Sequence, residues 1–196
     1  MNKTIDSYDK FAKELANKFD AIGIRVKDVE RTFSYVKKEN PRVLELGCAN
    51  GRDAQEMLKR TKSYIGVDGS KELIKIAKEK LPQAKFIVNV FNKLEFPSHS
   101  FDIVFDFASL MHFDKDELTK MLKKISHWLD NDGVLLLSMK EGEYSQFLSK
   151  GFGERIQYNY QADDILSITA DDFEMLNLER MNTNNQDWFT MILKRK

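Results

Sequence analysis

The sequence predicts an α/β fold with a doubly wound, mostly parallel sheet. Apolar runs of strand length alternate with amphipathic helical patterns from Arg42 to Met139. Strands separated by helices of this length need right-handed crossovers, which produce a parallel sheet covered on both faces. The chain has 196 residues, of which 42% are hydrophobic. It can therefore bury one substantial core, and we expect one domain over residues 1–196.

Two amphipathic helices are expected before the first strand. Aromatic and aliphatic side chains recur at helical spacing over residues 4–20, with lysines and acids between them. Gly23 interrupts this pattern, and a second helical pattern over 26–36 ends at Asn40-Pro41. We expect these helices to form a lid over residues 1–40; the plainer alternative is that they only cover a sheet face.

The segment from Arg42 to Asp53 predicts a strand, a sharp turn and a helix. The strand Val43–Leu46 carries Glu45 and leads into a turn bounded by Gly47 and Gly51. Such a βα unit binds nucleosides in open α/β sheets. The G-x-G-x-x-G spacing of pyrophosphate sites is absent, so the carboxylate favours a nucleoside that carries positive charge. A plain turn whose glycines supply positive φ is the alternative.

Further strands and helices follow in alternation. Strands are expected over 63–68, 86–90, 101–105 and 134–139. Ser70 is placed to cap a helix that Pro82 stops, and Asp114 to cap the next one. Residues 131–133 are expected to form the turn before the fifth strand. These elements complete the alternating pattern of a doubly wound sheet.

The last third of the chain has a different pattern. An aromatic segment between residues 144 and 160 precedes a probable helix over 163–168. Two β-like runs, 173–181 and 188–193, are joined by the polar segment 182–186. Sequential runs with a short polar connection predict an antiparallel hairpin that closes one edge of the sheet.

Composition argues against several partner classes. Lys plus Arg and Asp plus Glu are 31 each, so no net charge attracts nucleic acid or an anionic membrane. The apolar runs are too short to span a bilayer, and residues 1–20 lack a signal-type apolar stretch, so a cytoplasmic location is expected. Cys48 is the single cysteine, and the three histidines lack metal-ligand spacing, so no metal site is expected.

Asp68 is the second residue of chemical interest. It ends the second expected strand, seventeen residues after Gly51, and precedes Gly69 and Ser70. An acid at this place hydrogen-bonds the ribose hydroxyls of a nucleoside that lies over the first loop. The alternative is that the carboxylate only helps to begin the next helix.

Together these segments resemble the class I S-adenosylmethionine-dependent methyltransferases. Residues 45–53 resemble their first motif, 66–70 their second, 94–104 their passage into strand four, and 131–135 the turn before strand five. Residues 8–12 look like the family's N-terminal lid, so the resemblance covers most of the chain. The runs 108–112 and 140–143 further resemble a bacterial branch that acts on small molecules.

The resemblance implies a Rossmann-like, seven-stranded sheet of order 3-2-1-4-5-7-6 with an antiparallel last strand. It divides the chain into the lid, a cofactor-binding core over 41–140, and a substrate-side segment with the C-terminal hairpin over 141–196. The implied cofactor is S-adenosylmethionine, which leaves as S-adenosylhomocysteine. Its implied contacts are Tyr8, Glu45, Gly47, Cys48, Ala49, Gly51, Asp68, Gly69, Ser70, Asn89, Val90 and Phe107.

The resemblance assigns Glu45 to the cofactor's amino group, Asp68 to the ribose, and Asn89 or Val90 to the adenine. Two positions depart from the family pattern. The aspartate common near the adenine is absent between Lys85 and Lys93. Ala49 replaces the usual middle glycine, which is tolerable if its φ stays negative.

His112, just past the fourth expected strand, is the candidate catalytic base, with a structural histidine as the alternative. Tyr144, Arg155, Tyr158 and Tyr160 are candidate walls of the substrate pocket, and Arg155 could hold an acidic acceptor. The tyrosines could equally be packing residues.

The sequence therefore predicts an S-adenosylmethionine-dependent methyltransferase that acts on a small molecule as a monomer or homodimer. Three alternatives stay open. They are an RNA or protein methyltransferase, a module that binds the cofactor without turnover, and an NAD-dependent oxidoreductase, which the missing G-x-G-x-x-G disfavours.

Overall fold

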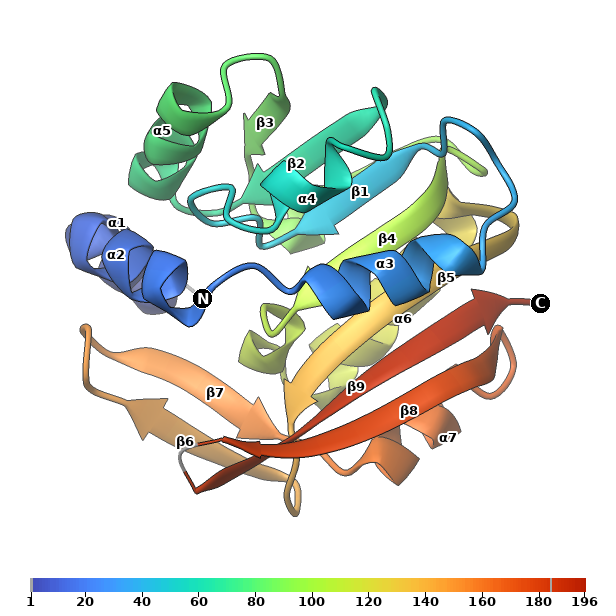
Figure 1. The fold of residues 1–196 in the computed structure, drawn as a ribbon. Helices are drawn as coiled ribbons and strands as arrows, with labels where there is room; N and C mark the ends of the chain where they lie inside the picture. The colour runs from blue at the N-terminus through green and yellow to red at the C-terminus, as the bar shows by residue number, and fades with distance from the viewer. Residues whose placement is uncertain (1, 184) are drawn as a thin grey trace.

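The computed structural model describes residues 2–183 and 185–196 and shows a seven-stranded sheet with helices on both faces (Figure 1). The strand order is β3-β2-β1-β4-β5-β9-β8. The strands are β1 Val43–Leu46, β2 Tyr64–Asp68, β3 Lys85–Val88, β4 Phe101–Phe107, β5 Leu129–Lys140, β8 Phe173–Thr183 and β9 Gln186–Arg195. Strand β9 is antiparallel to both β5 and β8. The expected order and antiparallel strand are therefore confirmed, with β9 and β8 as the last two strands of the sheet.

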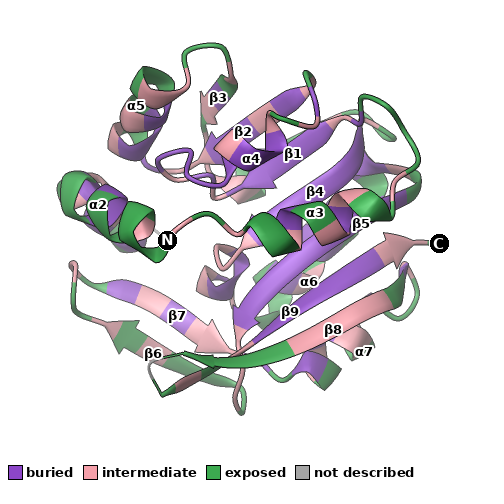
Figure 2. Cartoon of the chain, viewed as in Figure 1, coloured by how far each residue is buried: buried purple, intermediate pink, exposed green. Residues whose placement is uncertain are grey.

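Each face of the sheet packs on its own helices. One face contacts α3 (Val26–Ser34), α4 (Ala54–Met57) and α5 (Lys71–Lys80), and the other contacts α6 (Lys115–Trp128) and α7 (Ala162–Thr169). The central strands are almost entirely buried, as Figure 2 shows. Burial on both faces explains why these strands are continuous apolar runs in the sequence.

Local capping places the two long helices as expected. The Ser70 hydroxyl accepts a hydrogen bond from the N–H of Leu73 at 3.2 Å and begins α5. The Asp114 carboxylate accepts from the N–H of Glu117 at 2.9 Å and begins α6. Each cap satisfies one of the donors that a helix N-terminus leaves unpaired.

The N-terminal segment differs from the single helix expected over 4–20. It forms α1 (Asn2–Lys10) and α2 (Ala12–Ile22), separated at Phe11, whose backbone leaves the helical region. The break lets the two helices turn relative to one another. In Figure 1 they lie between α5 and a separate small sheet. Helix α3 ends at Ser34, before the expected stop at Asn40-Pro41.

The small sheet was not predicted. Its strands β6 (Ser145–Ser149) and β7 (Arg155–Asn159) form an antiparallel hairpin within the aromatic segment. The turn expected over 131–133 was also wrong, because β5 continues through it, with a register shift between the pairs Phe101–Leu129 and Ile103–Val134; Asp132, within this irregular stretch, has a φ of 63°. The C-terminal hairpin has the expected pairing, and Asn184 of its connection lies outside the described residues.

No helix in the described part of the chain has the length and apolar character needed to cross a membrane.

Candidate active site

A cavity of about 540 Å³ opens at the carboxyl ends of β1, β2 and β4, in the size range of small-molecule sites. The lid helices, β5, β7 and the β8–β9 hairpin supply its other walls. Of the residues predicted from the sequence, the lining contains Tyr8, Glu45, Gly47, Cys48, Ala49, Asp68, Gly69, Ser70, Asn89, Val90, Phe107, His112 and Arg155. It does not contain Gly51, Tyr144, Tyr158 or Tyr160.

The loop after β1 is held against β2 by its backbone. The N–H groups of Gly47 and Cys48 both donate to the carbonyl of Val67, at 2.8 and 3.1 Å. Gly47 and Gly51 have φ values of 72° and 74°, a region that favours glycine. A side chain at Gly51 would contact Ala77, so this glycine allows α5 to pack on the loop rather than contributing to the cavity.

Ala49 does not have the negative φ that the sequence analysis required. Its φ is 47°, in the left-handed region, where the Cβ atom of an L-residue approaches the following carbonyl oxygen. The Ala49 N–H donates to the Asp68 carboxylate at 3.0 Å. This hydrogen bond helps to hold the loop in the strained conformation.

Asp68 is the acid that closes β2. Besides Ala49, its carboxylate accepts from the N–H of Ser70 at 2.8 Å, so two backbone donors orient it at the cavity wall. Burial raises the pKa of Asp68 to about 6, against the lowering effect of these hydrogen bonds. A carboxylate oxygen accepts more than one hydrogen bond, so Asp68 can still accept from ligand hydroxyls.

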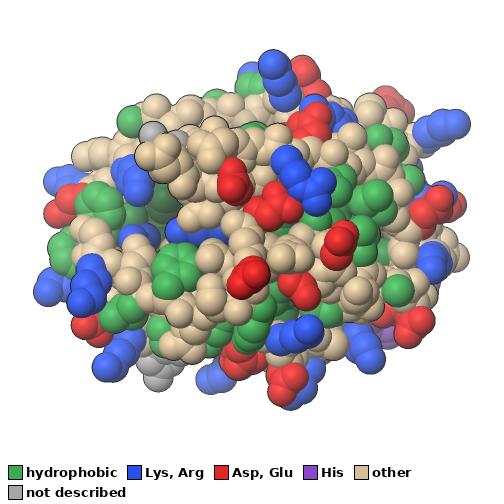
Figure 3. Space-filling model, turned by 90° about the horizontal axis from the view of Figure 1, so that it is seen from below, with side chains coloured by type: hydrophobic (Ala, Val, Ile, Leu, Met, Phe, Trp, Pro, Cys, Tyr) green, Lys and Arg blue, Asp and Glu red, His purple; other side chains and the backbone are tan. Residues whose placement is uncertain are grey.

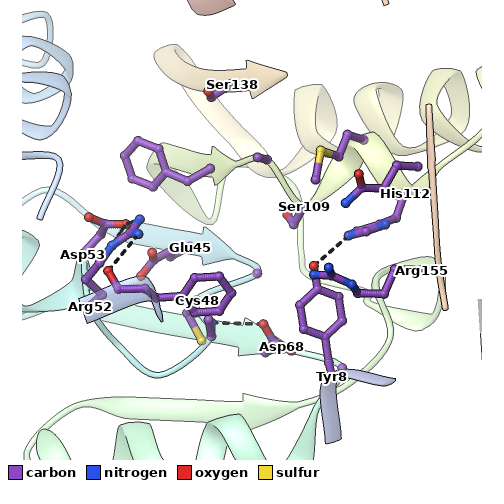
Figure 4. A pocket seen from close by; sticks show the side chains of 18 of the residues that line it. Tyr8, Glu45, Cys48, Arg52, Asp53, Asp68, Ser109, His112, Ser138 and Arg155 are labelled. Carbon is purple, nitrogen blue, oxygen red and sulfur yellow. Dashed lines mark hydrogen bonds and ion pairs between the residues drawn. The ribbon is translucent and has the colours of Figure 1, made fainter. Parts of the chain in front are cut away.

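Glu45 lies deeper, between the loop and Tyr64, whose hydroxyl donates to its carboxylate. Burial, followed by the charge of Asp53, raises the pKa of Glu45 to about 8. Asp53 is itself paired with Arg52 and Arg25. Figure 4 shows this ion-pair cluster beside Glu45.

Neither Glu45 nor Asp68 has a Lys or Arg partner within 4.0 Å among the residues that the structure describes. Glu45, which is buried, and Asp68, which is partly buried, therefore face one cavity without an ion-pair partner. A buried charge is costly without a partner, so this donor set fits a ligand that brings a cation to Glu45 and hydroxyls to Asp68.

The segment after β3 follows the same cavity wall. The Asn89 N–H donates to the Asp68 carbonyl at 3.0 Å, and its side-chain oxygen accepts from the Val90 N–H at 2.9 Å. The Asn89 amide group keeps its two donors for a ligand, whereas its oxygen is already engaged. Val90 and the following Phe91 add apolar surface at this end of the cavity.

His112 lies at the end of the cavity opposite Glu45, and both nitrogens of its ring have a hydrogen-bond partner. Nδ1 contacts the Ile156 carbonyl, which can only accept, so Nδ1 carries the proton. Nε2 therefore accepts from the Tyr8 hydroxyl at 3.0 Å. Burial, together with the charges of Arg155 and Lys140, lowers the pKa of His112 to about 4, so the ring is neutral near pH 7.

The β6–β7 hairpin explains which aromatic-segment residues reach the cavity. Alternate residues of a strand point to opposite faces, so Arg155 and Gln157 line the cavity while Tyr158 points away. Tyr158 stacks on the exposed Tyr144 at 5.9 Å between ring centroids. Tyr160 is fully buried and donates to the Phe113 carbonyl at 2.7 Å. The three tyrosines thus pack outside the cavity lining.

Several lining residues were not predicted from the sequence, among them Lys140, Gln157 and Arg25. Lys140 ends the fifth strand, Gln157 follows Arg155 at strand period, and Arg25 lies 4.7 Å from the ring centroid of Phe107. A polar residue at the end of an apolar strand was the available signal for Lys140. The described residues contain no group of three or more His, Cys, Asp or Glu side chains suited to a metal ion.

Comparison with known proteins gives the same family. Residues 43–133 match the model of a methyltransferase domain. The chain is 27% identical over 145 residues to a ubiquinone/menaquinone biosynthesis C-methyltransferase of Campylobacter jejuni, covering 69% of this chain and 60% of that relative. It is 35% identical over 103 residues to a trans-aconitate 2-methyltransferase of Rhodopseudomonas palustris, covering 51% of this chain and 39% of that relative.

The fold is also similar to a solved structure, the 1,6-didemethyltoxoflavin-N1-methyltransferase of Burkholderia thailandensis with bound S-adenosylhomocysteine. The TM-score is 0.77 at 16% identity, over 98% of this chain and 88% of that one. The matched domain includes both cofactor motifs, Glu45 to Gly51 and Gly66 to Ser70. Residues 43–133 therefore match a methyltransferase domain, and the whole chain has the fold of an S-adenosylmethionine-dependent methyltransferase, the class whose cofactor is S-adenosylmethionine.

Proposed function

We propose that this protein transfers the methyl group of S-adenosylmethionine to a small-molecule acceptor. The observation that carries the proposal is a pair of carboxylates on one cavity wall, the buried Glu45 and the partly buried Asp68, neither of which has an ion-pair partner among the described residues. In this assignment Glu45 faces the cofactor's amino group and Asp68 accepts from its ribose hydroxyls. Asn89 and Val90 border the adenine.

The cofactor supplies a methyl group on a positively charged sulfur, and its transfer to an acceptor lone pair leaves S-adenosylhomocysteine. The protein contributes alignment and exclusion of water. Helix α1 serves the second purpose, because Ile5 lies over Gly69, where an added Cβ would come within 2.9 Å of the Ile5 side chain. Tyr8 of the same helix reaches across the cavity to His112.

His112 is not free to take a proton directly from an acceptor, because the Tyr8 hydroxyl occupies Nε2. The geometry supports a relay instead. An acceptor O–H or N–H would pass its proton to the Tyr8 oxygen as the Tyr8 proton moves to Nε2 of His112. Figure 4 shows the hydrogen bond between the two side chains. Acceptors that are already ionised would not need it.

Several observations favour a small molecule as the acceptor. The lid helices and the β6–β7 hairpin supply part of the cavity lining, and the volume of the cavity suits small ligands. In the view of Figure 3, acidic and basic side chains are interspersed, without the single-sign surface that nucleic acid requires. Relatives that are named for a small-molecule substrate, such as the trans-aconitate 2-methyltransferase, agree with this choice.

The cofactor assignment is tested by titrating S-adenosylhomocysteine into wild type and Asp68→Ala in a calorimeter. We expect Asp68→Ala to bind at least about 30-fold more weakly, since it loses charged hydrogen bonds to two hydroxyls. Asp163→Ala, an exposed carboxylate on α7, is the matched control and should bind like wild type. No binding by wild type, or equal binding by Asp68→Ala, contradicts the assignment.

A binding module without turnover is the alternative that remains. It is distinguished by incubating protein and S-adenosylmethionine with a panel of small acids, amines and phenols, trans-aconitate included. Formation of S-adenosylhomocysteine that depends on an acceptor supports the enzyme. Tight cofactor binding with no product from any acceptor supports the module.

A further inference from the structure

The end of the cavity opposite Glu45 carries positive charge that no acid balances. Arg155, Lys140 and Lys18 all line the cavity, and the charges of Arg155 and Lys18 both act on Lys140. Within the described ranges, none of the three has an Asp or Glu partner within 4.0 Å. Arg25 and Arg52, the cations at the other end, are both paired with Asp53. The unbalanced charge is therefore confined to the acceptor end of the site.

Arg155 is the most informative of these residues because it is only 7% exposed. One nitrogen, Nη2, donates to the Ser149 hydroxyl at 3.1 Å. Nε is buried and has no hydrogen-bond partner among the described residues. A guanidinium carries five N–H donors, and a buried charge with so few partners is costly. Its donors are thus available to a ligand in the cavity.

The surroundings hold the guanidinium in place. Its central carbon lies 5.4 Å from the ring centroid of Tyr8, and Figure 4 shows it reaching over that ring toward the middle of the cavity. The neighbouring Ser149 contact comes from the facing strand of the same hairpin. Stacking and one fixed hydrogen bond orient the fork of donors before any ligand arrives.

Lys140 supplies a second charge from β5. Its Nζ donates to the Gln157 side chain at 2.8 Å and lies 4.6 Å from the ring centroid of Phe147. Burial, followed by the charges of Arg155 and Lys18, lowers the pKa of Lys140. Like charges that oppose one another across one space are relieved when an anion enters that space.

We propose that this end of the cavity is an oxyanion subsite, in which Arg155 and Lys140 bind a carboxylate or phosphate group of the methyl acceptor. This deepens the proposed function and rests on it. The planar guanidinium fork matches both oxyanions, and the lysine adds a point charge. The acceptor is accordingly an organic acid or phosphate ester whose charged group is held while another part of the molecule faces the methyl group.

The subsite is tested on protein saturated with S-adenosylhomocysteine, in low-salt buffer free of oxyanions. Benzoate, phenyl phosphate and the uncharged benzamide are titrated by calorimetry. We expect one or both anions to bind at least about 10-fold more tightly than benzamide, and the stronger anion identifies the acceptor's group. Equal binding of all three ligands, or no binding of either anion, overturns the proposal.

Variants assign the effect to Arg155. Arg155→Met should lower anion affinity about 10- to 100-fold and leave benzamide unchanged, and Arg155→Lys should fall between it and wild type. Lys150→Met removes an exposed charge from the connection between the same two strands and should change nothing. Anion affinity that survives Arg155→Met, or that Lys150→Met lowers equally, overturns the assignment.

The affinity for S-adenosylhomocysteine is measured for each variant in the same experiments. Affinity retained within about threefold shows that the cofactor end is intact. Absence of any anion preference in the wild type, with S-adenosylhomocysteine still bound, rejects the subsite alone. Failure of wild type to bind S-adenosylhomocysteine rejects the proposed function.

Discussion

If Glu45 faces the cofactor's amino group, as proposed, cofactor binding should depend on pH in a direction that follows from the pKa of this carboxyl. In the free protein, burial and the charge of Asp53 raise its pKa to about 8. At neutral pH most molecules therefore carry a protonated Glu45. A bound ligand that brings an ammonium group to this carboxyl favours its ionised form, so binding must release a proton.

The size of the effect follows from the pKa. With a pKa of about 8, roughly 1% of the carboxyl is ionised at pH 6 and about half at pH 8. If the complex keeps Glu45 ionised throughout this range, the affinity for S-adenosylhomocysteine rises about 50-fold from pH 6 to pH 8. At pH 7 about 0.9 protons should leave per ligand bound.

The assay is calorimetric titration at pH 6, 7 and 8 in pairs of buffers with different ionisation enthalpies, which counts the protons released. Glu45→Gln is the matched control, because it keeps the size of the side chain and removes its titration. Its affinity should be lower than that of wild type at pH 8 and nearly flat across the range. Asp68, whose pKa is about 6, stays in both proteins and contributes equally.

Two results would refute this reasoning. A wild-type affinity that is flat from pH 6 to 8 would mean that Glu45 is already ionised in the free protein. An equal slope in Glu45→Gln would assign the proton to another group.

The stability of the cofactor-free protein gives an independent check of the direction of the Glu45 pKa shift. Glu45 binds its proton more tightly in the folded than in the unfolded protein. The free energy of unfolding of the cofactor-free protein should therefore fall as the pH rises from about 4.5 to 8.

Two further predictions concern the loop and the relay. Ala49→Gly should stabilise the protein by about 1 kcal/mol in urea unfolding, because glycine relieves the strain at a φ of 47°; unchanged or lower stability would contradict this origin. Tyr8→Phe should slow methylation of a protonated acceptor identified in the panel by about 100-fold, with cofactor affinity within about threefold of wild type. His112→Gln should behave alike, and an unchanged rate in either variant would remove that residue from the relay.

Much of the sheet was predictable because its determinants are local. Strand β1, the Ser70 and Asp114 caps and the C-terminal hairpin each depend on residues close in sequence. Glu45 and Asp68 were predictable for a related reason. Parallel strands present their carboxyl ends at one edge, so acids at two strand ends meet without further information.

Hydrophobic patterns did not reveal the conformations that depend on context. The φ of Ala49 reflects a turn held by Asp68, nineteen positions later, and the break at Phe11 occurs within a continuous apolar pattern. The β6–β7 hairpin was missed because aromatic residues are compatible with packing, pocket walls and strands alike.

From the sequence by itself the alternating elements and the two acids at one wall of the cavity were predictable, and the resemblance added the strand order. Only the tertiary structure decided which side chains meet at the end of the cavity opposite Glu45. Tyr8 meets His112 across 104 positions, and His112 meets Ile156 across 44. Strand pairing turns Arg155 into the cavity and Tyr158 away from it. Whether a donor is free or a charge is unpaired depends on every residue packed around it, so a local sequence pattern cannot predict it.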